Sequence, residues 1–87
     1  MTTAPSLRIE VVAFAQAREA LGSGRVPLTL PAGSRIADAL AALVTAHPAL
    51  APHTTHLAVA IDRRLARREQ ALTDGCELAL LPPVSGG

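Results

Sequence analysis

The last residues of the chain carry its most distinctive chemistry, because the sequence closes on the run PPVSGG at residues 82–87. Glycine accepts backbone angles that other residues cannot, and proline fixes φ, so Gly86 and Gly87 form a thin, pliable thread on a stiff stalk. At ~3.3 Å per residue, the stretch after Pro83 reaches roughly 13 Å from a folded body. Such a thread fits a narrow active site in another protein. We therefore expect the α-carboxylate of Gly87 to be the reactive group.

A frayed terminus is the simple alternative, because disorder concentrates at chain ends. The segment ELALL at residues 77–81 argues against it, since it has the composition of a strand and runs directly into Pro82 without a polar linker. We therefore expect three parts: a flexible N-terminal segment at residues 1–6, one domain at 7–83 and an extended Gly-Gly tail at 84–87.

Three other residue types that can do chemistry are less well placed. His47, His53 and His56 match no closed zinc pattern and no cysteine pairs accompany them, so no metal site is expected. Cys76 occupies an expected inward strand position, where cysteine behaves as a small buried hydrophobe. Ser85 has no neighbouring base of the kind that a hydroxyl nucleophile needs.

The arginines and the missing lysines narrow the choice of partners. Four of the eight arginines lie at positions 63, 64, 67 and 68, but Asp62 and Glu69 flank them and the formal charge of the chain is only +1, so a solvated hairpin is expected. Without lysine, the Gly-Ser-Gly turn at 22–24 cannot be a P-loop. Phe14 is the single aromatic residue, which excludes a stacking platform for nucleobases. No nucleic-acid partner is expected.

Length and hydropathy limit the classes of protein to which this chain can belong. Eighty-seven residues suit one small domain with a modest core, and 49% of them are hydrophobic. The first six residues have neither the basic nor the apolar region of a signal peptide, and no run approaches the ~18 apolar residues of a membrane span. A single cysteine fits a reducing compartment. We expect a cytoplasmic protein with no membrane partner.

The first half of the chain predicts two strands and a short helix. Leu7, Ile9 and Val11 alternate with more polar residues, which indicates a half-buried strand, and Phe14 is expected to close its inner face. Residues 15–21 favour a helix that ends at Gly22. A second strand is expected at 26–30, and because Pro27 lacks a backbone donor, this strand should lie at a sheet edge.

The middle of the chain predicts the main helix. Ser34 is placed to cap it, and apolar residues recur with helical spacing at 36, 39, 40, 43 and 44. His47-Pro48 should end the helix, because a residue before proline is pushed away from helical angles. Residues 48–56 are expected to form a loop.

The second half predicts the remaining strands. A third strand is expected at 57–61, a turn at 62–64, a short return strand at 65–66, and a last strand launched by the Asp74-Gly75 turn. In the last strand, positions 76, 78 and 80 should face the core, whereas 77, 79 and Leu81 should face outward. This order favours an α+β fold of the ubiquitin-like β-grasp type, a mixed sheet with one main helix packed on one face.

Two segments resemble one family. FAQAREALG at residues 14–22 and LTDGCELALLPPVSGG at 72–87 are similar to the small subunit of molybdopterin synthase, the MoaD-type sulfur carriers. The chain departs from that family at Cys76, where Asp is usual, and at Leu80-Leu81, where Phe-Phe is common. The second departure removes aromatic area from the predicted contact at Leu81.

The resemblance implies a carrier and not a catalyst. Gly87 would be adenylated by a MoeB-type enzyme, which uses the ATP, and then converted to a thiocarboxylate; the carrier itself would hold no cofactor stably. Its sulfur would pass to a pyranopterin precursor in a MoaE-type large subunit. By the same resemblance, Val84, Ser85 and Gly86 would lie in the active site of that partner. The root of the tail would dock through Leu81, Pro82 and Pro83.

Three alternatives stay open. A sulfur carrier for thiazole or another sulfur pathway would also end in Gly-Gly, although the FAQARE segment argues against it. A ubiquitin-like modifier would become linked to lysines of other proteins. A structural interaction domain would have an inert tail.

Overall fold

A computed structural model describes residues 5–83 and shows an α+β domain, as the sequence predicts. Residues 1–4 of the predicted N-terminal segment lie outside the described residues. The predicted tail at 84–87 lies outside them as well. In chain order the elements are β1 (Ser6–Ala13), α1 (Ala15–Leu21), β2 (Arg25–Pro31), α2 (Ile36–Ala46), the 3₁₀ helix η1 (Pro48–His53), β3 (Ala58–Ile61), β4 (Arg64–Ala66) and β5 (Glu77–Leu81).

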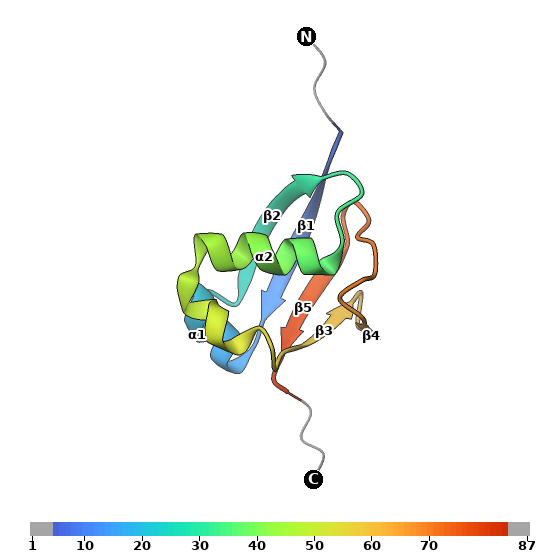
Figure 1. Ribbon diagram of the computed structural model, residues 1–87. Helices are drawn as coiled ribbons and strands as arrows, with labels where there is room; N and C mark the ends of the chain where they lie inside the picture. The colour runs from blue at the N-terminus through green and yellow to red at the C-terminus, as the bar shows by residue number, and fades with distance from the viewer. Residues whose placement is uncertain (1–4, 84–87) are drawn as a thin grey trace.

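The five strands form one mixed sheet in the order β2-β1-β5-β3-β4, with α2 crossing one face (Figure 1). The two central strands, β1 and β5, run parallel, and every other neighbouring pair is antiparallel. Strand β2 lies at an edge, which confirms the prediction from Pro27. The parallel pair places the first and the last strand of the chain side by side in the sheet. No helix among residues 5–83 is long and apolar enough to cross a membrane.

The core lies between the sheet and α2. Period-two alternation on β1 buries its odd positions, and the predicted helical spacing buries one stripe of α2. On β5 the predicted inward positions are buried, with Leu78 and Leu80 fully enclosed. Full burial of one such side chain contributes roughly 1.5–3 kcal/mol. The buried residues of these three elements are Leu7, Ile9, Val11, Ala13, Ile36, Ala39, Leu40, Leu43, Leu78, Ala79 and Leu80.

Phe14 does not close the inner face, and that prediction was wrong. Its side chain is 48% exposed, because Phe14 follows the alternation of β1 and shares the outer side with Glu10 and Val12. Its backbone is extended and caps the start of α1. The Phe14 N–H donates to the carbonyl oxygen of Leu80 at 3.2 Å. The ring therefore lies next to the end of β5.

Ser34 does not cap α2, which is a second correction. The residue is buried, and its hydroxyl donates to the carbonyl oxygen of Pro31 at 2.7 Å, so it closes the preceding turn. Arg35 takes the capping position, and its N–H donates to Oδ2 of Asp38 at 2.8 Å. The acidic side chain in the first turn also suits the positive end of the helix dipole.

The predicted loop after α2 is partly a 3₁₀ helix. Proline suits the first turn of a helix because that turn leaves N–H groups without partners, and Pro48 begins η1. Leu50 from this short helix is fully buried and fills the core beside α2. Its apolar residues Ala49, Leu50 and Ala51 are consecutive and show no helical period, so the pattern did not indicate this helix.

Arg68 is not part of a solvated hairpin, which corrects the prediction for one of the four arginines. Its half-buried guanidinium donates to the carbonyl oxygens of Thr54 and, at 3.0 Å, of Leu57. Its own carbonyl oxygen accepts the N–H of Ala37 at 2.9 Å, in the first turn of α2. Arg68 thus ties the segment after β4 to α2 and to the approach to β3. The other three arginines of the group are exposed, as expected.

The predicted turns are present and need left-handed backbone. Gly22 ends α1 with φ 74, and Gly75 launches β5 with φ 83. The turn between β3 and β4 places two residues other than glycine in this region, Asp62 with φ 47 and Arg63 with φ 72.

Candidate functional site

The outer face of the sheet, opposite α2, carries a row of apolar side chains at its centre. Strand pairing aligns Val12 on β1 with Ala79 on β5, Ala79 with Ala60 on β3, and Ala60 with Leu65 on β4. A hollow of about 450 Å³ lies over this row. Its apolar lining is Val12, Phe14, Ala60, Leu65, Ala79 and Leu81. We call these six residues the outer apolar face.

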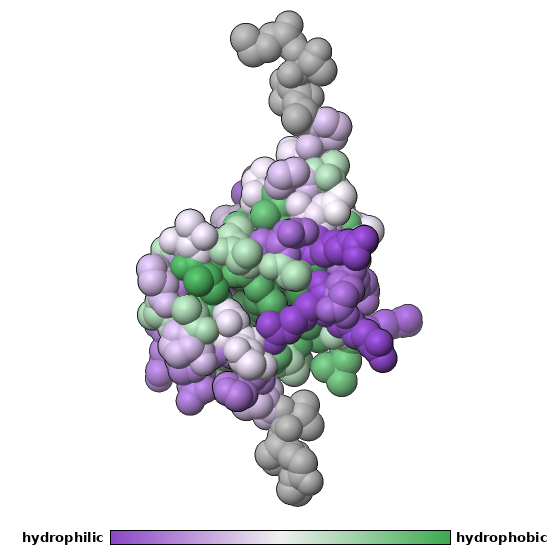
Figure 2. Space-filling model, viewed as in Figure 1, coloured by the Kyte–Doolittle hydropathy of each residue, from purple (hydrophilic) through white to green (hydrophobic). Residues whose placement is uncertain are grey.

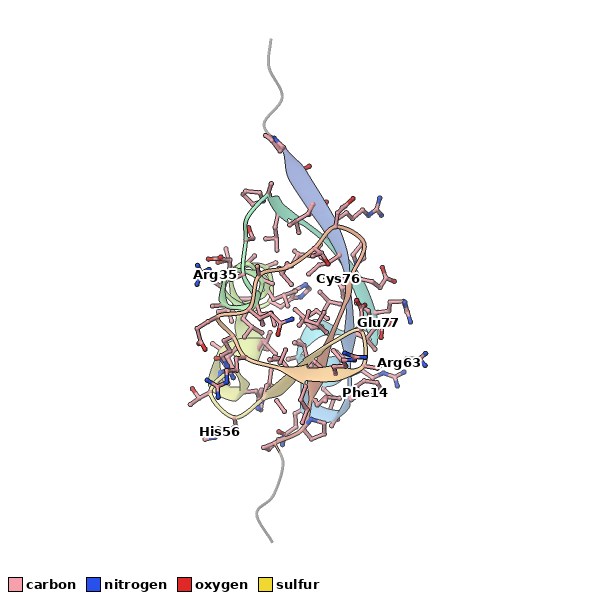
Figure 3. The ribbon with its side chains drawn as sticks, turned by 90° about the vertical axis from the view of Figure 1, so that its right-hand side faces the viewer. Phe14, Arg35, His56, Arg63, Cys76 and Glu77 are labelled. Carbon is pink, nitrogen blue, oxygen red and sulfur yellow. The ribbon has the colours of Figure 1, made fainter. Side chains whose placement is uncertain are left out.

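Two members of the outer apolar face are strongly exposed for large hydrophobic side chains. Phe14 is 48% exposed and Leu65 is 73% exposed. Figure 3 shows Phe14 on the side of the sheet away from Arg35, the residue that caps α2. Single exposed apolar residues are ordinary, but a cluster of them around a hollow is typical of a surface that another protein covers.

The root of the tail joins this face directly. Leu81 points outward, as predicted, and lines the hollow half-buried, whereas Pro82 and Pro83 are exposed. Leu80, one residue earlier, is fully buried and accepts the N–H of Phe14. The chain therefore leaves the core at the rim of the outer apolar face without an intervening linker. A partner on this face would also meet the beginning of the tail.

Charged side chains form one border of the hollow. Arg25 on β2 donates to Oε1 of Glu10 at 3.0 Å and lies 3.9 Å from Oε2 of Glu77. The Arg25 side chain is 60% exposed, so these surface pairs contribute little to stability. Arg63 lines the same hollow from the turn between β3 and β4. The border is polar and the centre is apolar, which is the usual anatomy of a protein interface.

The structure locates only part of the predicted site. Leu81, Pro82 and Pro83 lie together at the end of β5, and residues 84–87, which include the predicted reactive residue Gly87, lie outside the described residues. Sequence reasoning missed Phe14 and Leu65 as surface residues. The alternation of β1 was the signal for Phe14, because even positions face outward there. For Leu65 the signal was the short hairpin, which pairs it with an outward position of β3.

The other candidates for chemistry do not assemble into a site. Within residues 5–83 no three side chains of His, Cys, Asp or Glu come together as metal ligands. His56 is exposed, and His47 and His53 are half-buried at and beyond the end of α2. Cys76 is 3% exposed and free, which confirms that it is a buried thiol in the core.

Known proteins resemble this chain along nearly its whole length. A sequence profile of the ThiS family matches residues 11–87. The molybdopterin synthase sulfur carrier subunit of Chlamydomonas reinhardtii is 36% identical over 83 residues, which are 93% of this chain and 100% of that relative. Small archaeal modifier protein 1 of Haloferax volcanii is 39% identical over 82 residues, which are 85% of this chain and 94% of that relative.

Solved structures agree with the sequence comparison. The crystal structure of SAMP1 from Haloferax volcanii superposes with a TM-score of 0.81 at 38% identity, covering 92% of this chain and 99% of that one. This likeness confirms the ubiquitin-like β-grasp fold predicted from the element order. The chain is therefore a member of the ThiS family and a relative of the sulfur carrier subunits of molybdopterin synthase.

Proposed function

We propose that this chain is the sulfur carrier subunit of a molybdopterin synthase. The observation that supports the proposal most is the full-length similarity to a relative of that name, together with the PPVSGG ending. The fold adds a physical reason. The tail follows β5, a strand buried inside the sheet. A partner that binds the domain therefore also fixes the position at which the tail starts.

The chemistry begins at the carboxylate of Gly87. In a MoeB-type adenylating enzyme, a carboxylate oxygen attacks the α-phosphorus of ATP and pyrophosphate leaves, which gives an acyl adenylate. Sulfide from a sulfur donor then attacks the carbonyl carbon and displaces AMP, which leaves a thiocarboxylate. A carboxylate is a poor electrophile, and the adenylate supplies the leaving group. Glycine has no Cβ, so the carbonyl stays open to attack on both sides.

Docking delivers the thiocarboxylate. The outer apolar face packs on a MoaE-type large subunit, with Leu81, Pro82 and Pro83 at the root of the tail. Val84, Ser85 and Gly86 then lie in the active site of that subunit, and the sulfur of Gly87 passes to a pyranopterin precursor. The partner supplies the catalytic groups. This chain supplies the sulfur and the extended tail that carries the sulfur into the active site.

The mass of the C-terminal peptide from native cells tests this directly. A carrier gains the mass difference between sulfur and oxygen on Gly87. The variant Gly87→Val is expected to adenylate poorly because a branched Cβ crowds the carbonyl. Pyrophosphate exchange with the adenylating enzyme measures that step. Normal exchange by Gly87→Val, or a peptide that never carries sulfur in cells making the cofactor, would contradict the proposal.

A second candidate function is a ubiquitin-like modifier, favoured by the 39% identity to small archaeal modifier protein 1. In that role Gly87 would form amide bonds with lysines of other proteins, and denaturing gels would show a ladder of adducts. This chain contains no lysine and offers no side-chain acceptor of its own. A carrier for thiazole synthesis would give the same thiocarboxylate, but it would fail to supply sulfur to the large subunit of molybdopterin synthase.

A further inference from the structure

We propose that Arg63 selects the partner of the outer apolar face by pairing with a carboxylate on that partner. The inference rests on the proposed function, because it names a contact within the same docking face. The occupant is thus a protein surface with an apolar centre and an acidic side chain opposite the turn between β3 and β4.

The turn that carries Arg63 is held firmly against β5. The Asp62 N–H donates to the carbonyl oxygen of Glu77 at 2.9 Å, and Oδ1 of Asp62 accepts the N–H of Glu77 at 2.9 Å. These two hydrogen bonds fix the residue before Arg63 to the start of the central strand. Figure 3 shows Arg63 on the same side of the sheet as Phe14 and Glu77. Arg63 therefore stands at a fixed point on the rim of the hollow, beside Leu65.

The backbone at Arg63 is better suited to another residue. Its φ of 72 lies in the left-handed region, and two-residue hairpin turns of this kind favour glycine at the second position. Strain at a residue other than glycine persists only where the surrounding structure enforces it, and such residues cluster at functional sites. Stability of the turn does not require an arginine here, so the guanidinium itself needs another explanation.

The charges around the hollow leave Arg63 without a partner inside the domain. Among residues 5–83 the only ion pairs belong to Arg25, which takes both Glu10 and Glu77. Arg63 is exposed and lies against apolar surface. Guanidinium is planar and binds a carboxylate through two parallel hydrogen bonds. A partner that covers the outer apolar face would exclude water from such a pair, and the lower dielectric strengthens the attraction between the two charges.

The neighbouring residue provides a matched control. Arg64 on β4 is also exposed, but it pairs with Ile61 on β3 and lines a different hollow, which shares only Leu65 with the outer apolar face. Figure 2 shows hydrophilic side chains gathered on the β4 side of the face that α2 covers. Replacing Arg63 or Arg64 with glutamate changes the net charge of the protein by the same amount. Only Arg63 lies on the proposed docking face.

Calorimetry of the full chain with the large synthase subunit encoded by the same genome tests the inference. Arg63→Glu is expected to weaken binding by at least about tenfold, and Arg64→Glu by no more than about threefold. Leu65→Asp, which disrupts the apolar centre, is the positive control for the face. Equal losses in Arg63→Glu and Arg64→Glu, with a strong loss in Leu65→Asp, would overturn the role of Arg63 and leave the proposed function standing. Failure of the unmodified chain to bind would overturn both.

A second variant separates binding from folding. Arg63→Gly removes the charge and relieves the backbone, so its melting temperature should equal or exceed that of the unmodified chain. Its affinity should still fall by about tenfold. In addition, one Asp or Glu on the partner, changed to Arg, should restore binding of Arg63→Glu. Wild-type affinity in Arg63→Gly would overturn the proposal.

Discussion

Both faces of the sheet have an apolar centre, but helices cover the inner face and an open hollow lies over the outer face. Alternate residues of β5 supply both: Leu78 and Leu80 face α2 and are fully buried, whereas Ala79 and Leu81 belong to the outer apolar face. On the inner face the chain covers its own hydrophobic residues with α2 and η1. On the outer face, the described part of the chain leaves Phe14 and Leu65 exposed.

The difference separates what stabilises the domain from what recognises a partner. Hydrophobic residues lower the free energy of the folded monomer only when folding removes them from water. The residues of the inner face meet this condition, whereas Phe14 and Leu65 on the outer face do not. We therefore expect Phe14 and Leu65 to be removed from water only when another protein covers them, and substitutions on the two faces to have different consequences.

The largest effect on folding is expected from Leu78→Ala. It opens a cavity in the core, and we expect the free energy of unfolding to fall by about 3 kcal/mol. Leu81→Ala is the matched control, with the same atoms removed from the opposite face of the same strand, and should cost about 1 kcal/mol or less. Urea denaturation measures both. Equal losses would contradict the distinction between the faces.

The largest effect on binding is expected from Leu81→Asp. The change places a charge in the outer apolar face next to the root of the tail, so affinity for the large subunit should fall by about 2 kcal/mol. The melting temperature should change little because the side chain is only half-buried. Calorimetry measures the affinity. An unchanged affinity would remove Leu81 from the docking surface.

A smaller effect on folding is expected from Arg68→Ala, which sharpens the comparison on the inner side. The variant loses the hydrogen bonds to the carbonyl oxygens of Thr54 and Leu57, and should lower the free energy of unfolding by about 1.5 kcal/mol. Arg67→Ala, one residue earlier and exposed, should have almost no effect. If the two variants have the same stability, Arg68 is not the structural link described above.

Much of the fold follows from local patterns. The alternation of β1, the helical spacing of α2, the edge position required by Pro27 and the glycine turns all depend on nearby residues, and the structure agrees with them. Phe14 was assigned to the wrong face although the same alternation places it outside. Local reasoning favours burial of an aromatic residue, but the register of the strand decides its direction.

The remaining features depend on contacts that sequence spacing does not reveal. Arg68 reaches carbonyl oxygens 11 and 14 residues earlier because α2 and η1 place that segment beside it. Ser34 lies one residue before the capping position, and its hydroxyl donates to the carbonyl oxygen of Pro31. The outer apolar face combines residues that are far apart in the sequence. It could not be predicted without the order of the strands in the sheet. The Gly-Gly tail stays a prediction from its residues, because residues 84–87 lie outside the part of the chain that the structure describes.

The most direct test of the account compares the full chain with one that lacks Gly86 and Gly87 in a reconstituted synthase. Each protein is first treated with the adenylating enzyme, ATP and a sulfur donor, and formation of the dithiolene product is then measured. We predict product only with the full chain, while both proteins melt at the same temperature and bind the large subunit through the outer apolar face. Equal product from the truncated protein would show that the terminal glycines do not carry the sulfur.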